Sequence, residues 1–270
     1  MDFFRPNTDI RKQRKILKKE LRLPYKLKVT NTRVYLSSSL GSYMTDDKKI
    51  PMGELNYIKQ VKAFIVKNKL YEGIPKIKED RISYMRYSSK LRPGFEAADC
   101  YEIDMRGAYW EMLRRSNLLD PVLYEKSMKT NPETGEPYIS KPTKLACAGS
   151  LAGNARVYEF DGKEETMRRE NNKLTEHIWN HIAYQVSKIM KEAQRAAGAD
   201  FLMFWVDAVF VRSKKGRAAV IRVLRKHKYE FSEIDIKSLE VKDKKVHVTK
   251  AKKNAKKKFR TFPFAPHKQR

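Results

Sequence analysis

The chain has 270 residues, enough for one hydrophobic core of good size or for a core with small attached lobes. Its 59 lysines and arginines against 32 acids give a formal net charge of +27, far more than solubility requires. This charge predicts a polyanionic partner held through phosphate contacts, and the 11% of aromatic residues argues against a disordered basic protein. Charge alone leaves a ribosomal, packaging, virion or nucleoid protein open.

Two cysteines, Cys100 and Cys147, lack metal-type spacing and fit a reducing compartment. The sequence has no signal peptide and no run of about 20 apolar residues. We therefore expect an intracellular protein of the cytoplasm without a membrane partner. For a viral protein the location would be the host cytoplasm or the virion.

The N-terminal part is predicted to contain a helix from Thr8 or Asp9 to about Leu23, followed by short strands and turns over residues 25–54. A second amphipathic helix is expected over residues 54–70. The broad Arg and Lys face of the first helix is equally consistent with a solvated surface and with a nucleic-acid contact.

Residues 201–211 form an almost unbroken apolar run with one carboxylate, Asp207, near the middle. The aromatic and β-branched residues predict two buried strands joined by a hairpin at this acid. An unpaired ion among such neighbours costs several kcal/mol, so we expect Asp207 to be satisfied by hydrogen bonds, a cation or a metal ion.

A second acid, Asp104, lies in a strand-turn-helix pattern. Residues 101–105 alternate like a short strand, Gly107 permits a sharp turn, and residues 108–113 begin a helix. Two acids at strand ends are the arrangement by which a sheet holds two divalent ions about 4 Å apart for phosphoryl transfer.

Three segments resemble the palm motifs of family B DNA polymerases, in the family's order and rough spacing. Residues 104–109 are similar to Asp-x-x-Ser-Leu-Tyr-Pro, and residues 207–211 to the second half of Asp-Thr-Asp-Ser-Ile-Phe. Between them, residues 144–154 resemble Lys-x-x-x-Asn-Ser-x-Tyr-Gly. The resemblance implies a polymerase palm.

This sequence also departs from the family pattern. Trp205 replaces the first acid of the Asp-Thr-Asp motif, and Gly149 and Ala152 replace the Asn and Tyr of the middle motif. Lys144 lies one residue too far from Ser150. Because no acid-rich exonuclease pattern precedes the palm motifs, we expect a reduced version of the enzyme.

The resemblance implies two Mg²⁺ or Mn²⁺ ions bound by Asp104, Asp207 and the backbone carbonyl of Met105. The implied reaction is template-directed DNA synthesis, with transfer of a nucleotide to a 3′-hydroxyl. Tyr109 occupies the family position that stacks under the sugar and favours deoxynucleotides. The other nucleotide-binding residues implied are Lys144, Ser150 and Gly153.

Two further segments are expected to contact nucleic acid. In residues 81–94 cations alternate with aromatics that suit base stacking, although an ordinary surface strand is equally consistent. Tyr87 and Lys90 of this segment correspond to a template-contacting segment of the family. Residues 248–255 resemble its primer-gripping Lys-Lys-x-Tyr segment, and the contact residues expected there are Lys250, Lys252, Lys253 and Asn254.

The remaining pattern predicts helices over residues 176–197 and 216–228 and two strands over residues 234–248. Together with the strand at 101–105 and the hairpin at 201–211, they give the order β-α-β-β-α-β. We therefore predict an α+β fold, a polymerase palm with a ferredoxin-like antiparallel sheet and helices on one face. Small basic elements are expected at both termini.

The expected domains are a basic N-terminal region (1–95), a palm (96–249) with a short fingers insertion near 114–155, and a basic tail (250–270). The predicted partners are primer-template DNA, deoxynucleoside triphosphates and other replication or virion proteins. The alternative is an inactive palm that binds DNA as a replication accessory, or a basic structural protein. A virus or mobile element is a plausible source of so compressed a polymerase.

Overall fold

The computed structural model describes residues 10–30, 33–46, 54–152, 155–170, 175–251 and 259–264. The chain forms two compact units, each assembled from separate segments. Unit 1 comprises residues 1–76 and 113–181, and unit 2 comprises residues 77–112 and 182–270. The chain thus passes between the units three times, so this division does not follow the three consecutive ranges expected from the sequence.

Unit 2 contains a seven-stranded sheet in the order β12-β11-β10-β5-β9-β8-β4, with every neighbouring pair antiparallel. The four strands β10-β5-β9-β8, connected through α6 and α7, have the ferredoxin-like topology, which confirms the predicted α+β palm layout. The strands of this sheet are β4 (Met85–Tyr87), β5 (Glu96–Met105), β8 (Phe201–Trp205), β9 (Ala208–Val211), β10 (Phe231–Lys242), β11 (Lys245–Lys250) and β12 (Phe259–Pro263).

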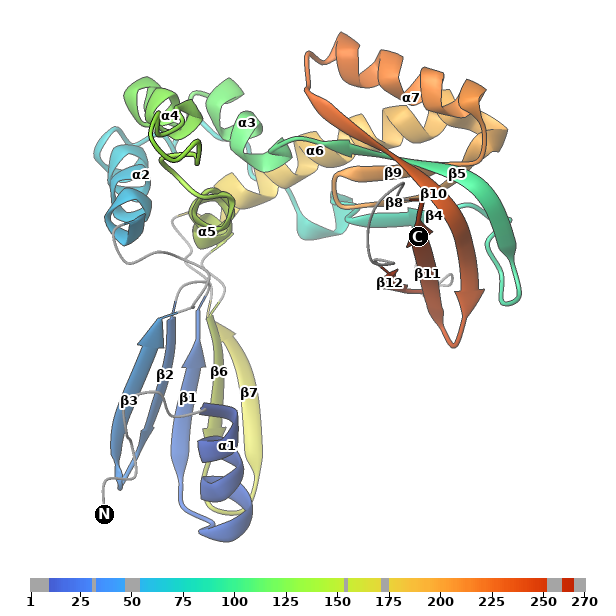
Figure 1. The fold of residues 1–270 in the computed structure, drawn as a ribbon. Coiled ribbons are helices and arrows are strands. Elements are labelled where there is room, and N and C mark those ends of the chain that lie inside the picture. Colours follow the sequence, from blue (N-terminus) through green and yellow to red (C-terminus); the bar gives the residue numbers. More distant parts are fainter. Residues whose placement is uncertain are drawn as a thin grey trace. The chain divides into compact units, whose positions relative to one another are not determined.

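Helix α7 (Lys214–Lys226) and the part of α6 (Glu176–Ala197) that belongs to this unit lie on one face of the sheet (Figure 1). Ser213 caps α7 by accepting a hydrogen bond from the Gly216 amide. The Arg217 guanidinium lies over the Tyr101 ring of β5, 5.4 Å from its centroid. Since side chains alternate along a strand, residues 101, 103 and 105 therefore face the helices.

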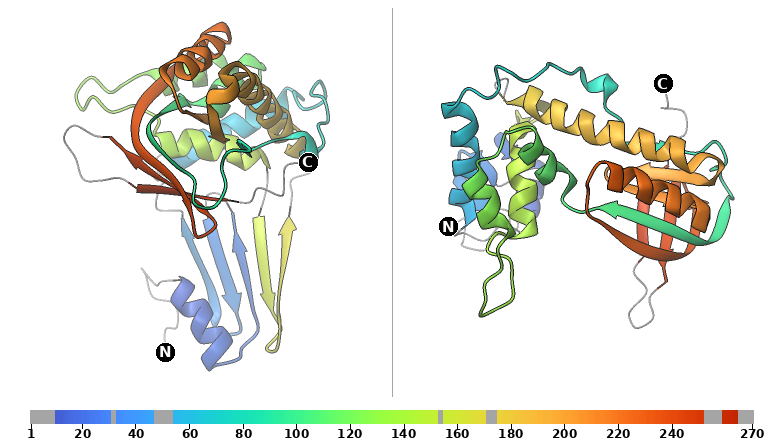
Figure 2. Two further views of the ribbon diagram at one scale, coloured as in Figure 1. Left: turned by 90° about the vertical axis from the view of Figure 1, so that its right-hand side faces the viewer. Right: turned by 90° about the horizontal axis from the view of Figure 1, so that it is seen from above.

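The opposite face of the same sheet is concave (Figure 1, Figure 2). Strands β10 and β11 curl over this face and bring β12 close to β4, the strand at the other edge of the sheet. The Tyr87 hydroxyl on β4 donates to the Pro263 carbonyl on β12, and the rings of Tyr87 and Phe264 lie 5.2 Å apart. Strand twist and a register shift between Ile236 and Ser238 allow this curl. The concave face therefore has its own apolar core, which includes Met203, Phe210, Leu239, Val248 and Phe262.

The sheet of unit 1 has five strands in the order β3-β2-β1-β6-β7. The helix α1 (Ile10–Lys15) and the π-helical turn η1 (Ile16–Glu20) pack on one face through Leu17, which is fully buried. The predicted N-terminal helix is present from Ile10 but ends at Glu20, before the expected Leu23, and its expected start at Thr8 or Asp9 lies outside the described residues. Strands are present within residues 25–46 as predicted, whereas β6 and β7 are not anticipated by the sequence. The strands are β1 (Tyr25–Val29), β2 (Arg33–Ser38), β3 (Gly41–Asp46), β6 (Ala155–Phe160) and β7 (Glu165–Glu170).

The other regular elements described in unit 1 are helices, and hydrogen bonds made by side chains tie them together. The Glu54 carboxylate, just before α2, accepts hydrogen bonds from the amide and the hydroxyl of Ser140, just before α5 (2.9 Å each). The Tyr57 hydroxyl on α2 donates to the Leu123 carbonyl on α4 (2.5 Å). The helices are α2 (Leu55–Lys67), the end of α3 (Ala108–Arg115), α4 (Pro121–Met128), α5 (Lys141–Ala152) and the start of α6.

Short 3₁₀ turns complete the described elements, at η3 (Glu79–Arg81) and η4 (Gly198–Asp200). The turn expected near Asn131 is present, with the Gly135 amide donating to the Asn131 carbonyl (2.8 Å). None of the helices in the described ranges combines the length and apolar character needed to cross a bilayer.

Candidate active site

Asp104 lies at the end of the central strand β5, opposite Ala208 on β9 and Ser232 on β10. One further bond of the β5–β10 ladder, from the Arg106 amide to the Glu230 carbonyl (2.9 Å), closes the end of the strand. Gly107 follows with φ +59°, a left-handed conformation that glycine adopts without strain, and α3 begins. The local sequence thus leaves Asp104 half-buried at a strand end, as predicted.

Asp207 lies in the two-residue turn between β8 and β9, immediately before Ala208. Its carbonyl accepts a hydrogen bond from the Met105 amide (3.0 Å), so the backbones of the two candidate acids are joined through neighbouring residues. The turn residue Val206 has φ +58°, which is strained for a β-branched side chain. Both acids are half-buried at adjacent strand ends of one sheet.

Tyr109 on α3 belongs to the same cluster. It is only 8% exposed, and burial raises the pKa of its phenol, with further increases from the negative charge of Asp207 and from Tyr84. The phenol therefore stays neutral beside the Asp207 carboxylate. The structure thus groups Tyr109 with Asp207, and its expected role beneath the sugar stays a prediction.

The donors near these acids suit a hard cation. Among the described residues, no group of three or more His, Cys, Asp or Glu side chains is placed to hold a metal ion. Mg²⁺ is usually bound by only one or two carboxylates together with water and substrate phosphates. Asp104, Asp207 and the Met105 carbonyl, all oxygen donors, therefore fit Mg²⁺ or Mn²⁺ arriving with a nucleotide; their role as ligands stays a prediction.

Trp205, at the position of the family's first motif acid, takes part in aromatic packing. Its ring centroid lies 5.1 Å from that of Phe262 on β12, and Phe262 lies 5.7 Å from Phe210. A packed aromatic group therefore occupies the position at which the family motif has a carboxylate.

Glu102 is a buried acid near the site that the sequence reasoning did not single out. It is 1% exposed and forms ion pairs with Arg260 of β12 (2.6 Å) and Lys250 of β11 (3.1 Å). Because it precedes Asp104 by two residues on β5, it lies on the same face of the strand. Strand alternation in the sequence would have indicated this face, but not the partner on β12.

The residues expected to contact nucleic acid have different surroundings in unit 2. Tyr87 is 4% exposed and packs in the core of the concave face. Lys90 is exposed, and its ammonium donates to the Ala199 carbonyl (2.8 Å). The ammonium of Lys250 neutralises Glu102. Of these three side chains, only Lys90 lies open on the surface.

The nucleotide-binding residues expected on α5 belong to unit 1, whereas the two acids belong to unit 2. Lys144 is half-buried; burial lowers the pKa of its ammonium, and Glu54 acts in the opposite direction. Ser150 is 6% exposed, and its hydroxyl donates to the Cys147 carbonyl (2.8 Å). The remaining expected residues, Gly153, Lys252, Lys253 and Asn254, lie outside the described ranges.

The sheet topology and the two acids at adjacent strand ends define a palm-like α+β fold of the polymerase type. No family model and no curated protein matches the sequence. Among solved structures, the chain is similar to Phi29 DNA polymerase in a ternary complex with primer-template DNA and incoming nucleotide substrates, with a TM-score of 0.52 and 10% identity. The match covers 77% of this chain and 59% of that chain, so the likeness shows a distant polymerase-like fold over part of the larger protein.

Proposed function

We propose that this chain is a reduced DNA polymerase of the family B type, which extends a primer 3′-hydroxyl along a DNA template. One observation carries the proposal: Asp104 and Asp207 lie at adjacent strand ends of a palm-like sheet, joined by the Met105 hydrogen bond. The substrates would be primer-template DNA and deoxynucleoside triphosphates.

In this proposal the half-buried carboxylates of Asp104 and Asp207 provide the negative charge that retains two divalent cations. When bound, such ions activate the 3′-hydroxyl and neutralise the triphosphate. The hydrogen bond between Met105 and Asp207 holds the two strand ends in register. The neutral, buried Tyr109 supports the sugar and disfavours a 2′-hydroxyl.

Charge supplies the second support. A formal net charge of +27 favours binding of a polyanion such as DNA. Because such binding depends on phosphate contacts, its affinity falls steeply as the salt concentration rises. Primer-template binding should therefore be strong at low salt even without a nucleotide.

The alternative, an inactive palm that binds DNA as a replication accessory, is favoured by Trp205. Its packing against Phe262 leaves an aromatic ring where the family motif has an acid. In that case Asp104 and Asp207 would serve as hydrogen-bonding groups of the sheet.

Extension of a labelled primer with Mg²⁺ or Mn²⁺ and each type of nucleotide separates the two functions. Wild-type protein should extend the primer, and Asp104→Asn and Asp207→Asn should each abolish extension while leaving DNA affinity unchanged or improved, because a negative charge is lost. Asp243→Asn is the matched control, since this exposed acid lies in the β10–β11 turn.

The control variant should keep wild-type extension. If the wild type binds DNA tightly but extends no primer with either metal, the accessory function replaces the polymerase. If either site variant extends primers at the wild-type rate, that acid is not a metal ligand of the reaction.

A further inference from the structure

The helical segment of α1 and η1 presents one strongly basic side. Lys12, Lys15 and Lys19 are exposed at spacings of three or four residues, which brings them to one side of the segment, and the exposed Arg22 follows just beyond its end, where φ is +49°. We call these four residues the basic stripe. The only acid between residues 10 and 22 is Glu20.

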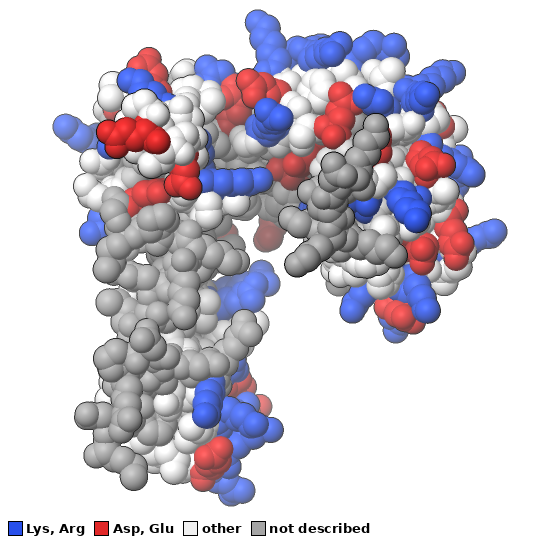
Figure 3. All heavy atoms as spheres, viewed as in Figure 1, with Lys and Arg blue, Asp and Glu red and all other residues white. Residues whose placement is uncertain are grey.

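The orientation of this segment is fixed by its apolar side. Leu17 is fully buried against Tyr25, Leu36 and Phe160 of the sheet, and Ile10 packs at the edge of the same cluster. The basic stripe consequently faces away from the sheet. In Figure 3, Lys and Arg side chains gather around the part of unit 1 where Figure 1 shows α1.

Two other cations of this segment already have an acidic partner. Arg14 and Lys18 lie between the apolar side and the basic stripe, and both form ion pairs with Glu165 of β7. Arg14 also lies over the Tyr158 ring, 4.5 Å from its centroid. These two cations share one carboxylate and are engaged in packing the helix on the sheet.

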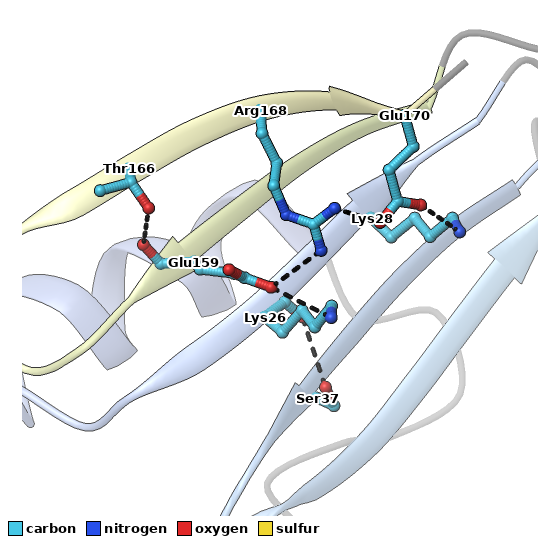
Figure 4. A network of polar contacts seen from close by, with 7 residues as sticks. All are labelled: Lys26, Lys28, Ser37, Glu159, Thr166, Arg168 and Glu170. Carbon is cyan, nitrogen blue, oxygen red and sulfur yellow. Dashed lines mark hydrogen bonds and ion pairs between the residues drawn. The ribbon is translucent and has the colours of Figure 1, made fainter.

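The opposite face of the same sheet carries an ion-pair ladder in which three cations share two acids (Figure 4). Lys26 pairs with Glu159 (3.0 Å) and Lys28 with Glu170 (2.7 Å). Arg168 bridges the same two acids at 3.3 and 2.6 Å. The acids of β6 and β7 are thus engaged with cations inside the unit.

The basic stripe differs from both groups. Within the described part of the chain, none of its four residues forms an ion pair. Exposed cations without compensating acids produce a positive field that attracts polyanions. Their long side chains allow each charged group to reach a phosphate without a fixed geometry.

We propose that the basic stripe binds the phosphate backbone of DNA and forms a second, non-catalytic contact surface on unit 1. A membrane surface is the less favourable partner, because an interfacial helix inserts an apolar side into the lipid. Here that side is used by Leu17 to pack on the sheet. The proposal does not depend on polymerase activity, since it uses neither Asp104 nor Asp207.

The test is the affinity of the full chain for a labelled primer-template and for its single strand, measured over a range of salt without nucleotide or metal. We expect Lys12→Gln/Lys15→Gln/Lys19→Gln to bind roughly tenfold more weakly, with a salt slope reduced by about 2–3, since each lost phosphate contact contributes about 0.9 to that slope on a duplex and about 0.7 on a single strand. Comparing the two DNA forms shows which one the basic stripe holds.

The matched control is Lys214→Gln/Lys215→Gln/Arg222→Gln, which removes three exposed cations from α7. It should retain affinity within about twofold, and a Lys→Arg triple variant of the basic stripe should bind like wild type because it keeps the charge. Circular dichroism melting confirms that the variants are folded. Failure of primer extension in the wild type would leave these results unaffected.

Equal losses in the two glutamine variants would overturn the proposal, because the effect would then be one of net charge alone. Unchanged affinity of the basic stripe variant would overturn it as well. Binding of the wild type to vesicles of anionic phospholipid, lost in the stripe variant while DNA affinity is kept, would assign the surface to a membrane instead.

Discussion

The two antiparallel sheets of this protein bury their faces in different ways. In unit 2 the central strand β5 is covered by helices on one face and by the curl of β11 and β12 on the other. In unit 1 the sheet is covered by a helix on one face and carries an ion-pair ladder on the other. The sheet that is covered on both faces holds Asp104 and Asp207 at defined positions, whereas the sheet that is covered on one face exposes charged side chains to solvent.

The largest effect should come from the concave core of unit 2. Phe210→Ala removes a fully buried ring and should lower the free energy of unfolding of unit 2 by about 3–5 kcal/mol. Leu36→Ala in unit 1 is the matched change and should cost about 2–4 kcal/mol there. Hydrogen exchange, read separately over the two units, should show each loss confined to its own unit.

Loss of protection across both units in either variant would show that the two sheets unfold together. The two sheets would then belong to one cooperative unfolding unit, in spite of the different ways in which their faces are covered.

A buried ion pair should matter more than an exposed one. Glu102→Gln leaves Arg260 and Lys250 without their carboxylate partner and should lower the free energy of unfolding by about 3 kcal/mol. Glu159→Gln in the exposed ladder should shift it far less, since exposed pairs are screened by water and salt. Urea denaturation of both variants measures the difference, and equal shifts would contradict it.

A substitution in the turn next to Asp207 should increase the stability of the protein. Val206→Asn places a residue that tolerates φ +58° in this position and should stabilise the protein by about 1 kcal/mol. Val66→Asn, at an exposed site within α2, serves as the control and should give no stabilisation. Thermal melting of the two variants provides the measurement, and a lower Tm for Val206→Asn would show that the valine is not strained.

The smallest effect concerns pH and the contact between α6 and α7. Hydrogen bonds from Lys226 and, next, His227 hold the pKa of Glu192 down at about 2. Because the folded pKa lies below the unfolded value of about 4.3, the stabilisation is complete above that value and is lost as pH falls toward 2. Glu192→Gln should therefore cost about 0.5 kcal/mol at pH 6 and almost nothing near pH 2.

Denaturant titrations of the wild type and the glutamine variant at both pH values check this sign. A stability difference that grows as the pH falls would be incompatible with the ion pair.

The sequence predicts the parts of the fold in which local pattern and final surroundings agree. The continuous apolar run gives the β8–β9 hairpin with Asp207 at its turn, and the stripe of Ile182, Val186 and Ile189 gives α6. The polar strand β7, with four exposed residues, has no such pattern and is stabilised by pairing with β6. Its existence depends on a partner strand and not on its own composition.

The same reasoning explains which residues of the candidate site could be recognised from the sequence. Asp104 and Asp207 are recognisable because each interrupts a local pattern, and pairing of β5 with β9 brings them together. The partner of Glu102 is not recognisable, since Arg260 lies 158 positions away. Tyr87 lies in a segment whose local pattern suits nucleic-acid contact, but β12 covers it from a distant part of the sequence.

The central position of β5 also constrains how the protein is made. Its two neighbours, β9 and β10, begin only at Ala208 and Phe231, so both edges of β5 stay unpaired while the intervening chain is synthesised. In unit 1 only one edge of β1 stays unpaired in this way, since β1 pairs with β2, which follows it directly, and with the much later β6. Folding from the ribosome must therefore wait for late segments, and the nascent strands need protection from aggregation meanwhile.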